Sequence, residues 1–415
     1  MSEIYRDFTA TIDRAAATLG LSRTQYEFAK YPERELRVSI PVEMDDGTVT
    51  IFEGYRVQHS SLLGPYEGGV CFHPGICQED LRGLAGLTTL KCTLAGLPFG
   101  GAKGGVAVDR QKLSRSELTR LTRRYTAMIL PIIGPDLDIP APDVGTDHEI
   151  MGWIMDTYSM MRGCAVPGIV TGKPAALGGS RGRADATGQG AVYVLREAMK
   201  RLKLPRDRCT AAIAGFGKVG RAAARGMYEE GIKLIAASDS SGAVLCPGGL
   251  DVPELCEFKQ NGGRLADYSA PGAVRGAREE VLSCACDILA TCAAVPLLDA
   301  ENVGAVDTRL VLESGSAQLS SAAHDALEQR EIPVVPDLVS TLGGVIVSYF
   351  ERVQNIQSLM WDEYEVGRML KSLILKTFDE VWQNANRQKT SLRMSAYQLA
   401  LERLCEAKRI RGIFP

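Results

Sequence analysis

The chain has 415 residues, 45% of them hydrophobic and 23% charged, which is the composition of a globular protein long enough for two domains. Its formal net charge of -3 gives no electrostatic reason to expect a nucleic-acid partner or an anionic membrane surface. The first residues lack the apolar core of a signal peptide, and no stretch approaches the roughly 18 apolar residues of a membrane helix. We therefore expect a cytoplasmic protein with no membrane contact.

The eleven cysteines are scattered along the chain. The closest pair, Cys284 and Cys286, has no second pair and no histidine nearby at ligand spacing. Structural zinc sites draw four such ligands, so we expect free thiols in a reducing compartment and no metal site.

The first half of the chain predicts a helix, a hairpin and two further helices. Apolar residues recur every four positions from Ile4 to Ala16, which is typical of one helix face. Alternating runs at 36–44 and 48–57 flank Asp45-Asp46-Gly47, which predicts a β-hairpin with Asp-Gly in its turn. Residues 80–95 and 114–133 then have a helical pattern.

Near residue 180 strands begin to alternate with helices, which indicates a parallel sheet with crossover helices. Helices are expected at 190–202 and 218–230, and strands at 210–214 and 233–238. Short apolar strands follow at 286–291, 310–313 and 333–335. Beyond Gly343-Gly344 the pattern is helical, most clearly at 349–360 and 363–386.

A G-x-G-x-x-G pattern lies between the strand at 210–214 and the following helix, the context in which this motif is informative. Glycines there permit the tight turn, the approach of a pyrophosphate and close helix–strand packing, and the helix N-terminus offers N–H groups to phosphate. Asp239 ends the next strand, where an acidic residue binds the adenosine ribose, which favours NAD with NADP possible. The alternative is a glycine turn of some other α/β fold. The motif residues are Gly215, Phe216, Gly217, Lys218, Val219 and Gly220.

A glycine-rich stretch from Gly64 to Gly105 contains Lys103 within Gly-Gly-Ala-Lys-Gly-Gly. We expect a tightly bent loop that lets a substrate approach the ammonium, and a lysine whose pKa is lowered by a crowded, cation-rich pocket. Downstream, two prolines flank Ala141 and hold the backbone near Asp143, which suits a positioned carboxylate. A lysine in such a loop taken alone is more often a surface residue, but the surrounding pattern favours catalysis.

With these motifs in view, the chain resembles the glutamate dehydrogenase branch of the Glu/Leu/Phe/Val dehydrogenase family. The likeness extends through the segments 56–59, 171–174, 178–180, 186–188 and 343–351. It implies an α/β fold with a substrate-binding and oligomerisation domain (1–180), a Rossmann-like dinucleotide domain (181–340) and C-terminal helices (341–415) that pack back on the first domain. It also implies a hexamer.

The resemblance assigns roles position by position. Lys103 matches the lysine that assists water at the iminium carbon, and Asp143 matches the acid that moves protons to and from the amino group. Lys91 matches the lysine that binds the substrate α-carboxylate, and Ser348 a serine that contacts the side-chain carboxylate of glutamate. Ala141 occupies a position that contacts the substrate in the family. The positions expected near the nicotinamide are those of Arg183, Thr187, Ser316 and Thr341. The implied reaction converts an L-amino acid into a 2-oxo acid and ammonia.

Several positions depart from the family pattern. Glu67 stands where glutamate-specific members carry a lysine that binds the side-chain carboxylate. At about 4 Å, two like charges repel by roughly 1 to 4 kcal/mol, so glutamate should bind poorly. At other positions this chain also differs from the family. Cys71 stands where the family has an arginine, Ser60 where it has an asparagine, and Thr88 where it has a methionine. Thr341 and Ser316 stand where the family usually has asparagines, and residues 290–293 replace a proline-containing turn.

Three interpretations follow from the sequence. The chain is an active dehydrogenase with changed specificity, in which Glu67 pairs with a basic side chain or no longer recognises a carboxylate. Alternatively it is a catalytically weak regulatory subunit that co-assembles with an active paralogue, or an ordinary glutamate dehydrogenase in which another cation compensates. The expected partners are a small amino acid and its 2-oxo acid, within a homo-hexamer or a hetero-oligomer.

Overall fold

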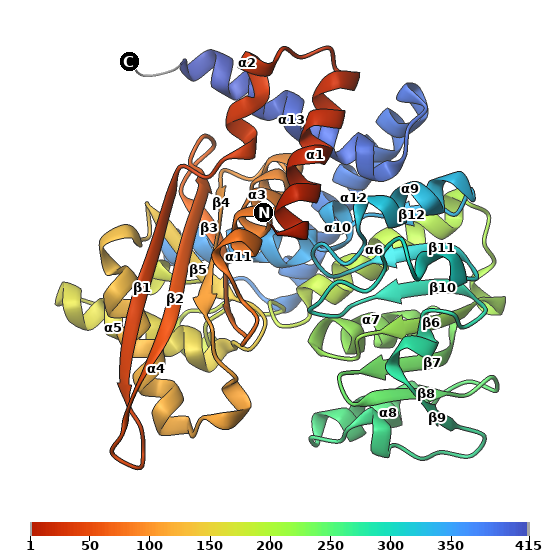
Figure 1. The fold of residues 1–415 in the computed structure, drawn as a ribbon, viewed down its shortest axis with the longest axis horizontal. Helices are drawn as coiled ribbons and strands as arrows, with labels where there is room; N and C mark the ends of the chain where they lie inside the picture. The colour runs from red at the N-terminus through yellow and green to blue at the C-terminus, as the bar shows by residue number, and fades with distance from the viewer. Residues whose placement is uncertain (1, 413–415) are drawn as a thin grey trace. The chain divides into compact units, whose positions relative to one another are not determined.

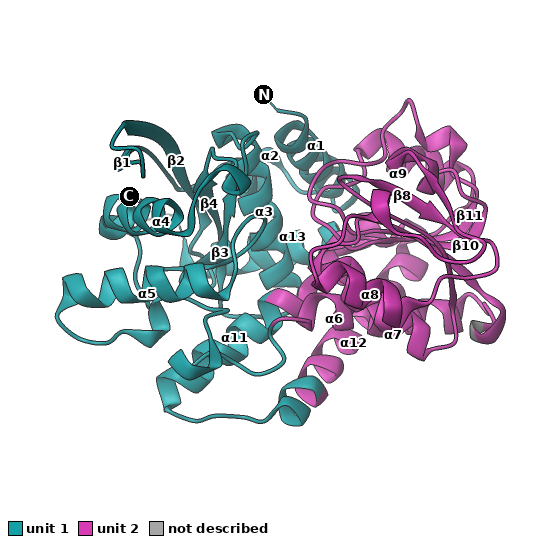
Figure 2. Ribbon diagram, turned by 90° about the horizontal axis from the view of Figure 1, so that it is seen from below, with its two compact units in different colours: residues 1–183, 345–367, 397–415 teal, residues 184–344, 368–396 magenta. Residues whose placement is uncertain are grey.

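A computed structural model of the protein describes residues 2–412, and its contacts divide the chain into two compact units (Figure 2). Unit 1 comprises residues 1–183, 345–367 and 397–415, and unit 2 comprises residues 184–344 and 368–396. The sequence placed all of 341–415 with the first domain, whereas the contacts divide this segment between both units. The third helix from the end, α11 (Leu342–Gln357), begins in unit 2 and continues into unit 1.

Unit 1 is built on a five-stranded mixed sheet (Figure 1). Strands β1 (Arg34–Glu43) and β2 (Val49–Ser60) form the predicted antiparallel hairpin, which is confirmed. The sheet order is β1-β2-β4-β3-β5. Here β3 (Tyr66–Phe72) lies parallel to both β4 (Gly100–Val106) and β5 (Asp138–Pro142), and β4 lies antiparallel to β2. The prolines of β5 are tolerated because this strand lies at an edge of the sheet.

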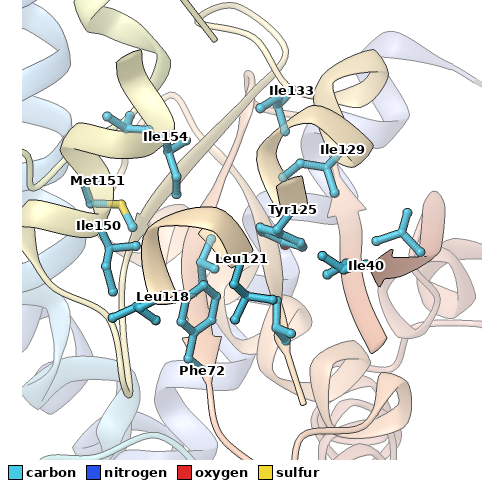
Figure 3. Packing of buried hydrophobic residues seen from close by; sticks show 14 of the residues in the cluster. Ile40, Phe72, Leu118, Leu121, Tyr125, Ile129, Ile133, Ile150, Met151 and Ile154 are labelled. Atoms are coloured by element: carbon cyan, nitrogen blue, oxygen red, sulfur yellow. The ribbon is translucent and has the colours of Figure 1, made fainter. Parts of the chain in front are cut away.

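Helices cover both faces of this sheet. On one face α3 (Gln78–Leu94) packs Leu81 and Ala85 against Tyr55 and Val57 of β2. On the other face lies a larger apolar core formed with α4 (Arg115–Ile129) and α5 (His148–Arg162) (Figure 3). Its members include Ile40, Phe72, Leu121, Tyr125 and Ile154. Unit 1 also contains α1 (Glu3–Thr18), α2 (Arg23–Tyr26), most of α11 and of α13 (Leu392–Arg411), and the first residues of α12 (Glu363–Gln388).

Unit 2 carries a seven-stranded sheet in the order β12-β11-β10-β6-β7-β8-β9. The five strands from β12 to β7 are parallel, as predicted, and two antiparallel strands that the sequence analysis did not predict extend the sheet beyond β7. The strands are β6 (Thr210–Ala214), β7 (Lys233–Asp239), β8 (Gly242–Leu245), β9 (Val274–Gly276), β10 (Cys286–Thr291), β11 (Thr308–Glu313) and β12 (Val334–Val335). The helices are α6 (Ala186–Arg201), α7 (Lys218–Glu229), α8 (Val252–Gln260), α9 (Ser321–Gln329), α10 (Asp337–Ser340) and much of α12 (Glu363–Gln388).

The architecture is therefore two α/β units, the second with a mainly parallel, Rossmann-like sheet. Within residues 2–412, no helix combines the length and apolar character needed to cross a membrane. All eleven cysteines are free thiols. The described part of the chain holds no cluster of three or more histidine, cysteine, aspartate or glutamate residues suited to a metal ion.

Candidate active site

The glycine-rich lysine segment is a buried strand of the sheet, and the prediction of a bent loop was wrong. Lys103 lies in the middle of β4, hydrogen-bonded between β2 and β3. Side chains alternate along a strand, so the register places Lys103 on the same face as Glu67, Gly69 and Cys71 of β3. The register of β3 with β5 adds Ala141 to this face. This face, which α3 covers, is called the substrate face below.

The glycines of β4 do not bend the chain; they let neighbouring groups pack closely against the strand. A Cβ at Gly101 would overlap backbone and side-chain atoms of Ala85 and Thr89 on α3, so the glycine lets this helix lie against the sheet. A Cβ at Gly104, on the opposite face, would meet the hydroxyl of Tyr125 and the side chain of Arg56. Glycine has a low intrinsic propensity for β-strands, so the extended backbone of β4 is imposed by hydrogen bonding to the neighbouring strands.

Lys103 forms an ion pair with Asp143, which follows directly after β5. Gly69 provides the space, since a Cβ there would overlap the Asp143 carboxylate. Burial lowers the pKa of Lys103, but the charge and hydrogen bond of Asp143, together with the nearby Cys71 and Glu67, outweigh burial and raise this pKa above its ordinary value. The predicted lowering was therefore wrong, because the sequence did not show how close the carboxylate lies. Burial raises the pKa of Asp143, yet the charge of Lys103 and the hydrogen bonds to the carboxylate together bring its net pKa below the usual range.

Three further groups hold Asp143 in place. Its Oδ1 accepts a hydrogen bond from the backbone of Val144 at 2.8 Å, and its own N–H donates to Thr146 Oγ1 at 2.7 Å. The Cys71 thiol also hydrogen-bonds the carboxylate, and burial raises the pKa of this thiol so that it keeps its proton. The residue that replaces an arginine in the resemblance thus contacts the carboxylate of the lysine–aspartate pair directly.

Glu67 lies at the other end of the substrate face with a side chain that is almost fully buried. Burial raises its pKa from 4.5 to about 7, and the charge of Arg183 and a hydrogen bond from Ser348 limit the rise. Its Oε2 has no hydrogen-bond partner among the described residues. A buried carboxylate oxygen without a donor is costly, so this position is unusual for a purely structural residue.

Ser348 of α11 connects Glu67 to Arg183. Its Oγ accepts hydrogen bonds from Thr171 Oγ1 at 3.0 Å and from Arg183 Nε at 3.2 Å. A hydroxyl has one proton, and with its oxygen already accepting twice, that proton is available for Glu67. The resemblance assigned Arg183 to the nicotinamide, and the structure places it in unit 1 beside Ser348.

A buried ion pair fixes the segment that supplies Thr171. Glu351, one helical turn after Ser348, binds Lys173 Nζ at 2.7 Å and accepts from the N–H groups of Gly172 and Ser180 at 3.0 and 3.1 Å. The sequence analysis noted these motifs but assigned Glu351 and Lys173 no role. A glutamate at helical spacing from Ser348, together with the glycine-lysine segment, was the available signal.

A second buried ion pair supports the sheet from its other face. Arg56 of β2 binds both oxygens of Asp138, with its Nε 2.9 Å from Oδ2, and Gln58 donates to the same carboxylate at 2.8 Å. Arg56 also donates to the carbonyl of Gly68 at 3.1 Å. It therefore fixes the β3 backbone directly after Glu67, a role that the sequence analysis missed.

The other predicted substrate residues also lie in unit 1. Lys91 is buried on α3, and its charge and that of Glu67 act on the same thiol, Cys92. Ala141 is buried on β5 beside Gly69. Cation, carboxylate and small residues thus gather between the sheet and α3.

The dinucleotide motif of unit 2 forms the predicted strand–turn–helix. Gly215 (φ +105°) lies against the backbone of Cys292 and Ala293, and Gly220 against the Gly215 carbonyl, so neither tolerates a Cβ. Gly217 caps α7 and faces open space. The residues therefore fit a pyrophosphate over Gly217 at the helix N-terminus, with Lys218 and Val219 in the first turn. Phe216 is buried, and its N–H donates to Ser238 O at 2.8 Å.

Asp239 already has protein partners. It lies 2.5 Å from Lys259 Nζ and accepts from Ser241 and from the Leu265 N–H. The nearby ammonium offsets the carboxylate charge, so Asp239 alone is a weak reason to prefer NAD over NADP.

The remaining predicted cofactor residues also belong to unit 2. Thr187 lies on α6, Ser316 follows β11, and Thr341 follows α10 and donates a hydrogen bond to the Asp337 carbonyl.

A Rossmann-like unit and a buried lysine–aspartate pair define a dinucleotide-dependent dehydrogenase that acts on an amine or a carbonyl. The family model described as Glutamate/Leucine/Phenylalanine/Valine dehydrogenase matches residues 178–412, and the one described as Glu/Leu/Phe/Val dehydrogenase, dimerisation domain, matches residues 32–160. The chain belongs to this family. It is an amino-acid dehydrogenase, and its curated relatives include NAD-specific and NADP-specific enzymes.

Individual relatives match over nearly the whole chain. The glutamate dehydrogenase of Thermotoga maritima is 42% identical over 413 residues, 99% of each chain. The catabolic NAD-specific glutamate dehydrogenase of Bacillus subtilis is 40% identical over 401 residues, 97% of this chain and 94% of that protein. The hetero-hexameric glutamate dehydrogenase from Thermus thermophilus, in a Leu-bound form, is 41% identical with a TM-score of 0.93 and covers 99% of this chain and 98% of its own.

Proposed function

We propose that this protein oxidatively deaminates an L-amino acid whose side chain does not end in a carboxylate, with NAD or NADP as hydride acceptor. The observation that carries the proposal is Glu67, a buried carboxylate on the substrate face. The overall reaction takes an L-amino acid, oxidised cofactor and water to a 2-oxo acid, ammonium, reduced cofactor and a proton.

The catalytic pair is in the required charge state before substrate binds. The pKa of Asp143 is lowered and that of Lys103 is raised, so near neutral pH the first is a carboxylate and the second an ammonium. We propose that Asp143 takes a proton from the α-ammonium and releases it to solvent, and that it later takes a proton from the attacking water and returns it to the departing amino group. Lys103 then stabilises the oxygen that becomes negative as water adds to the iminium carbon. When bound, the nicotinamide supplies the acceptor for the Cα hydride.

Glutamate should be a poor substrate for electrostatic reasons. Its side-chain carboxylate at about 4 Å from an ionised Glu67 costs roughly 1 to 4 kcal/mol, which is about 5- to 1,000-fold in affinity. The repulsion develops as the pH rises through about 7, the pKa of Glu67. Below that pH a protonated Glu67 can donate a hydrogen bond to glutamate instead.

The test is a panel of L-amino acids assayed with NAD and with NADP at pH 8, for the wild type and for Glu67→Lys. We expect weak turnover of glutamate by the wild type, turnover of an amino acid without a side-chain carboxylate, and a gain for glutamate in Glu67→Lys. Exposed Glu43→Gln on β1 is the matched control and should leave the profile unchanged. Turnover of glutamate above all other substrates in the wild type would overturn the proposal.

A second candidate function is supported by the likeness to a hetero-hexameric glutamate dehydrogenase. On this alternative the chain co-assembles with an active paralogue and contributes little turnover, and Glu67 keeps glutamate out of its own site. Absence of turnover by the purified chain with every amino acid, together with a mixed hexamer when the paralogue is co-expressed, would favour it. A catalytically competent homo-hexamer would contradict it.

A further inference from the structure

The side-chain carboxylate of Glu67 is short of one hydrogen-bond donor. Its residue is 1% exposed, and Oε2 has no partner among residues 2–412. An ionised oxygen in such a place is stable only when an N–H or O–H group points at it. Since Oε2 lies on the substrate face, the missing donor can come from a bound molecule.

The neighbouring protein donors are already committed. The Ser348 hydroxyl has one proton, which goes to Glu67, and its oxygen accepts from Thr171 and Arg183. Arg183 thus reaches Glu67 through the hydroxyl, and no direct ion pair between the two is among the contacts of the described residues. The carboxylate therefore has one oxygen with a donor and one buried oxygen without a donor.

The other charged groups around Glu67 are paired with one another without a ligand. Lys103 is paired with Asp143, and Arg56 with Asp138. The charge of Arg183, across Ser348, offsets that of Glu67 only in part, because burial keeps the pKa of Glu67 raised. A carboxylate side chain would add a second negative charge next to Glu67, and an ammonium side chain would have to give up its hydration in a buried site. A neutral side chain avoids both costs.

We propose that the substrate of this site carries an uncharged side chain ending in a hydrogen-bond donor, which is bound by Glu67 Oε2. A terminal carboxamide is the simplest such group, because its N–H groups can donate to the unpartnered oxygen. This inference rests on the proposed function and adds the substrate class to it. A site built around a hydrogen bond rejects analogues that lack the donor, because the buried acceptor is then left unpaired.

The experiment compares four side chains of similar length in the wild type: L-glutamine, L-glutamate, L-norleucine and L-ornithine, by initial rates with NAD and NADP. We expect kcat/KM for glutamine to exceed that for each of the others by about 10- to 100-fold. Where turnover is absent, calorimetric binding of the same four amino acids with the reduced cofactor present must give the same ranking.

Two variants separate the hydrogen bond from the charge. Glu67→Gln keeps an acceptor oxygen without the charge and should lose less kcat/KM for glutamine than Glu67→Leu, which should lose at least tenfold for glutamine and gain for norleucine. Norleucine or ornithine equal to glutamine in the wild type would overturn this inference and leave the proposed function standing. Glutamate as the best substrate would overturn both.

Discussion

The buried carboxyl group of Glu67 should make the stability of the protein fall as pH rises. Its pKa is about 7 in the folded protein, against 4.5 for an ordinary glutamate, because burial disfavours the ionised form. Between these two values the unfolded chain has lost a proton that the folded protein still holds, so unfolding becomes easier with rising pH. At 1.36 kcal/mol for each pH unit, the whole difference corresponds to ~3 kcal/mol. The cost is absent below about pH 4.5 and complete above about pH 7.

The variant Glu67→Gln removes this titration while keeping the shape of the side chain. Its free energy of unfolding, relative to the wild type, should therefore rise by roughly 2 to 3 kcal/mol between pH 5 and pH 8.5. Urea denaturation followed by tryptophan fluorescence, at one protein concentration, measures the difference. Other titrating groups cancel because both proteins share them.

The control is Glu43→Gln, at an exposed position on β1 of the same unit. Its difference from the wild type should stay within about 0.5 kcal/mol and should not change with pH. If the difference for Glu67→Gln is equally flat, the carboxyl group is not buried as an acid in the folded protein, and the electrostatic argument against glutamate fails with it.

Three further outcomes follow from the contacts of unit 1. Replacing Lys103 by Met should lower kcat/KM by about 10²- to 10⁴-fold with every substrate while leaving cofactor binding, measured by NADH fluorescence, unchanged. Arg56→Met leaves a buried carboxylate without its partner and should destabilise the protein by roughly 3 to 5 kcal/mol in urea denaturation; retained stability would contradict its supporting role. Gly69→Ala places a methyl group against Asp143 and should reduce kcat with an unchanged circular dichroism spectrum, whereas exposed Gly304→Ala should change neither.

Local patterns in the sequence were sufficient for much of the fold. The hairpin around Gly47, the strand–turn–helix at Gly215 and the parallel strands of unit 2 depend on side-chain alternation and turn residues that are close together in the chain. The strand β4 could not be recognised in this way. Its glycines have no side chains to alternate, and its extended form is imposed by β2 and β3 on either side.

The site was predictable as a set of residues but not as a set of contacts. Lys103 and Asp143 are 40 positions apart, and only the strand register shows that they touch. For the same reason the sequence could not show that the carboxylate would raise the pKa of the lysine. The contact between Glu67 and Ser348 joins residues 281 positions apart, with the long segment 184–344 of unit 2 between them, so no local pattern contains it.

Unit 1 is assembled from three stretches of chain, and this has a consequence for its synthesis. Residues 345–367, which carry Ser348 and Glu351, leave the ribosome only after the whole of 184–344. Until then Lys173 lacks the carboxylate that it binds in the finished protein, and Thr171 lacks its hydroxyl acceptor. Domains generally fold in the order in which they emerge. Residues 184–344 of unit 2 can therefore fold before Ser348 and Glu351 reach the substrate face, and each unit is completed only by a later segment, 368–396 for unit 2 and 397–415 for unit 1.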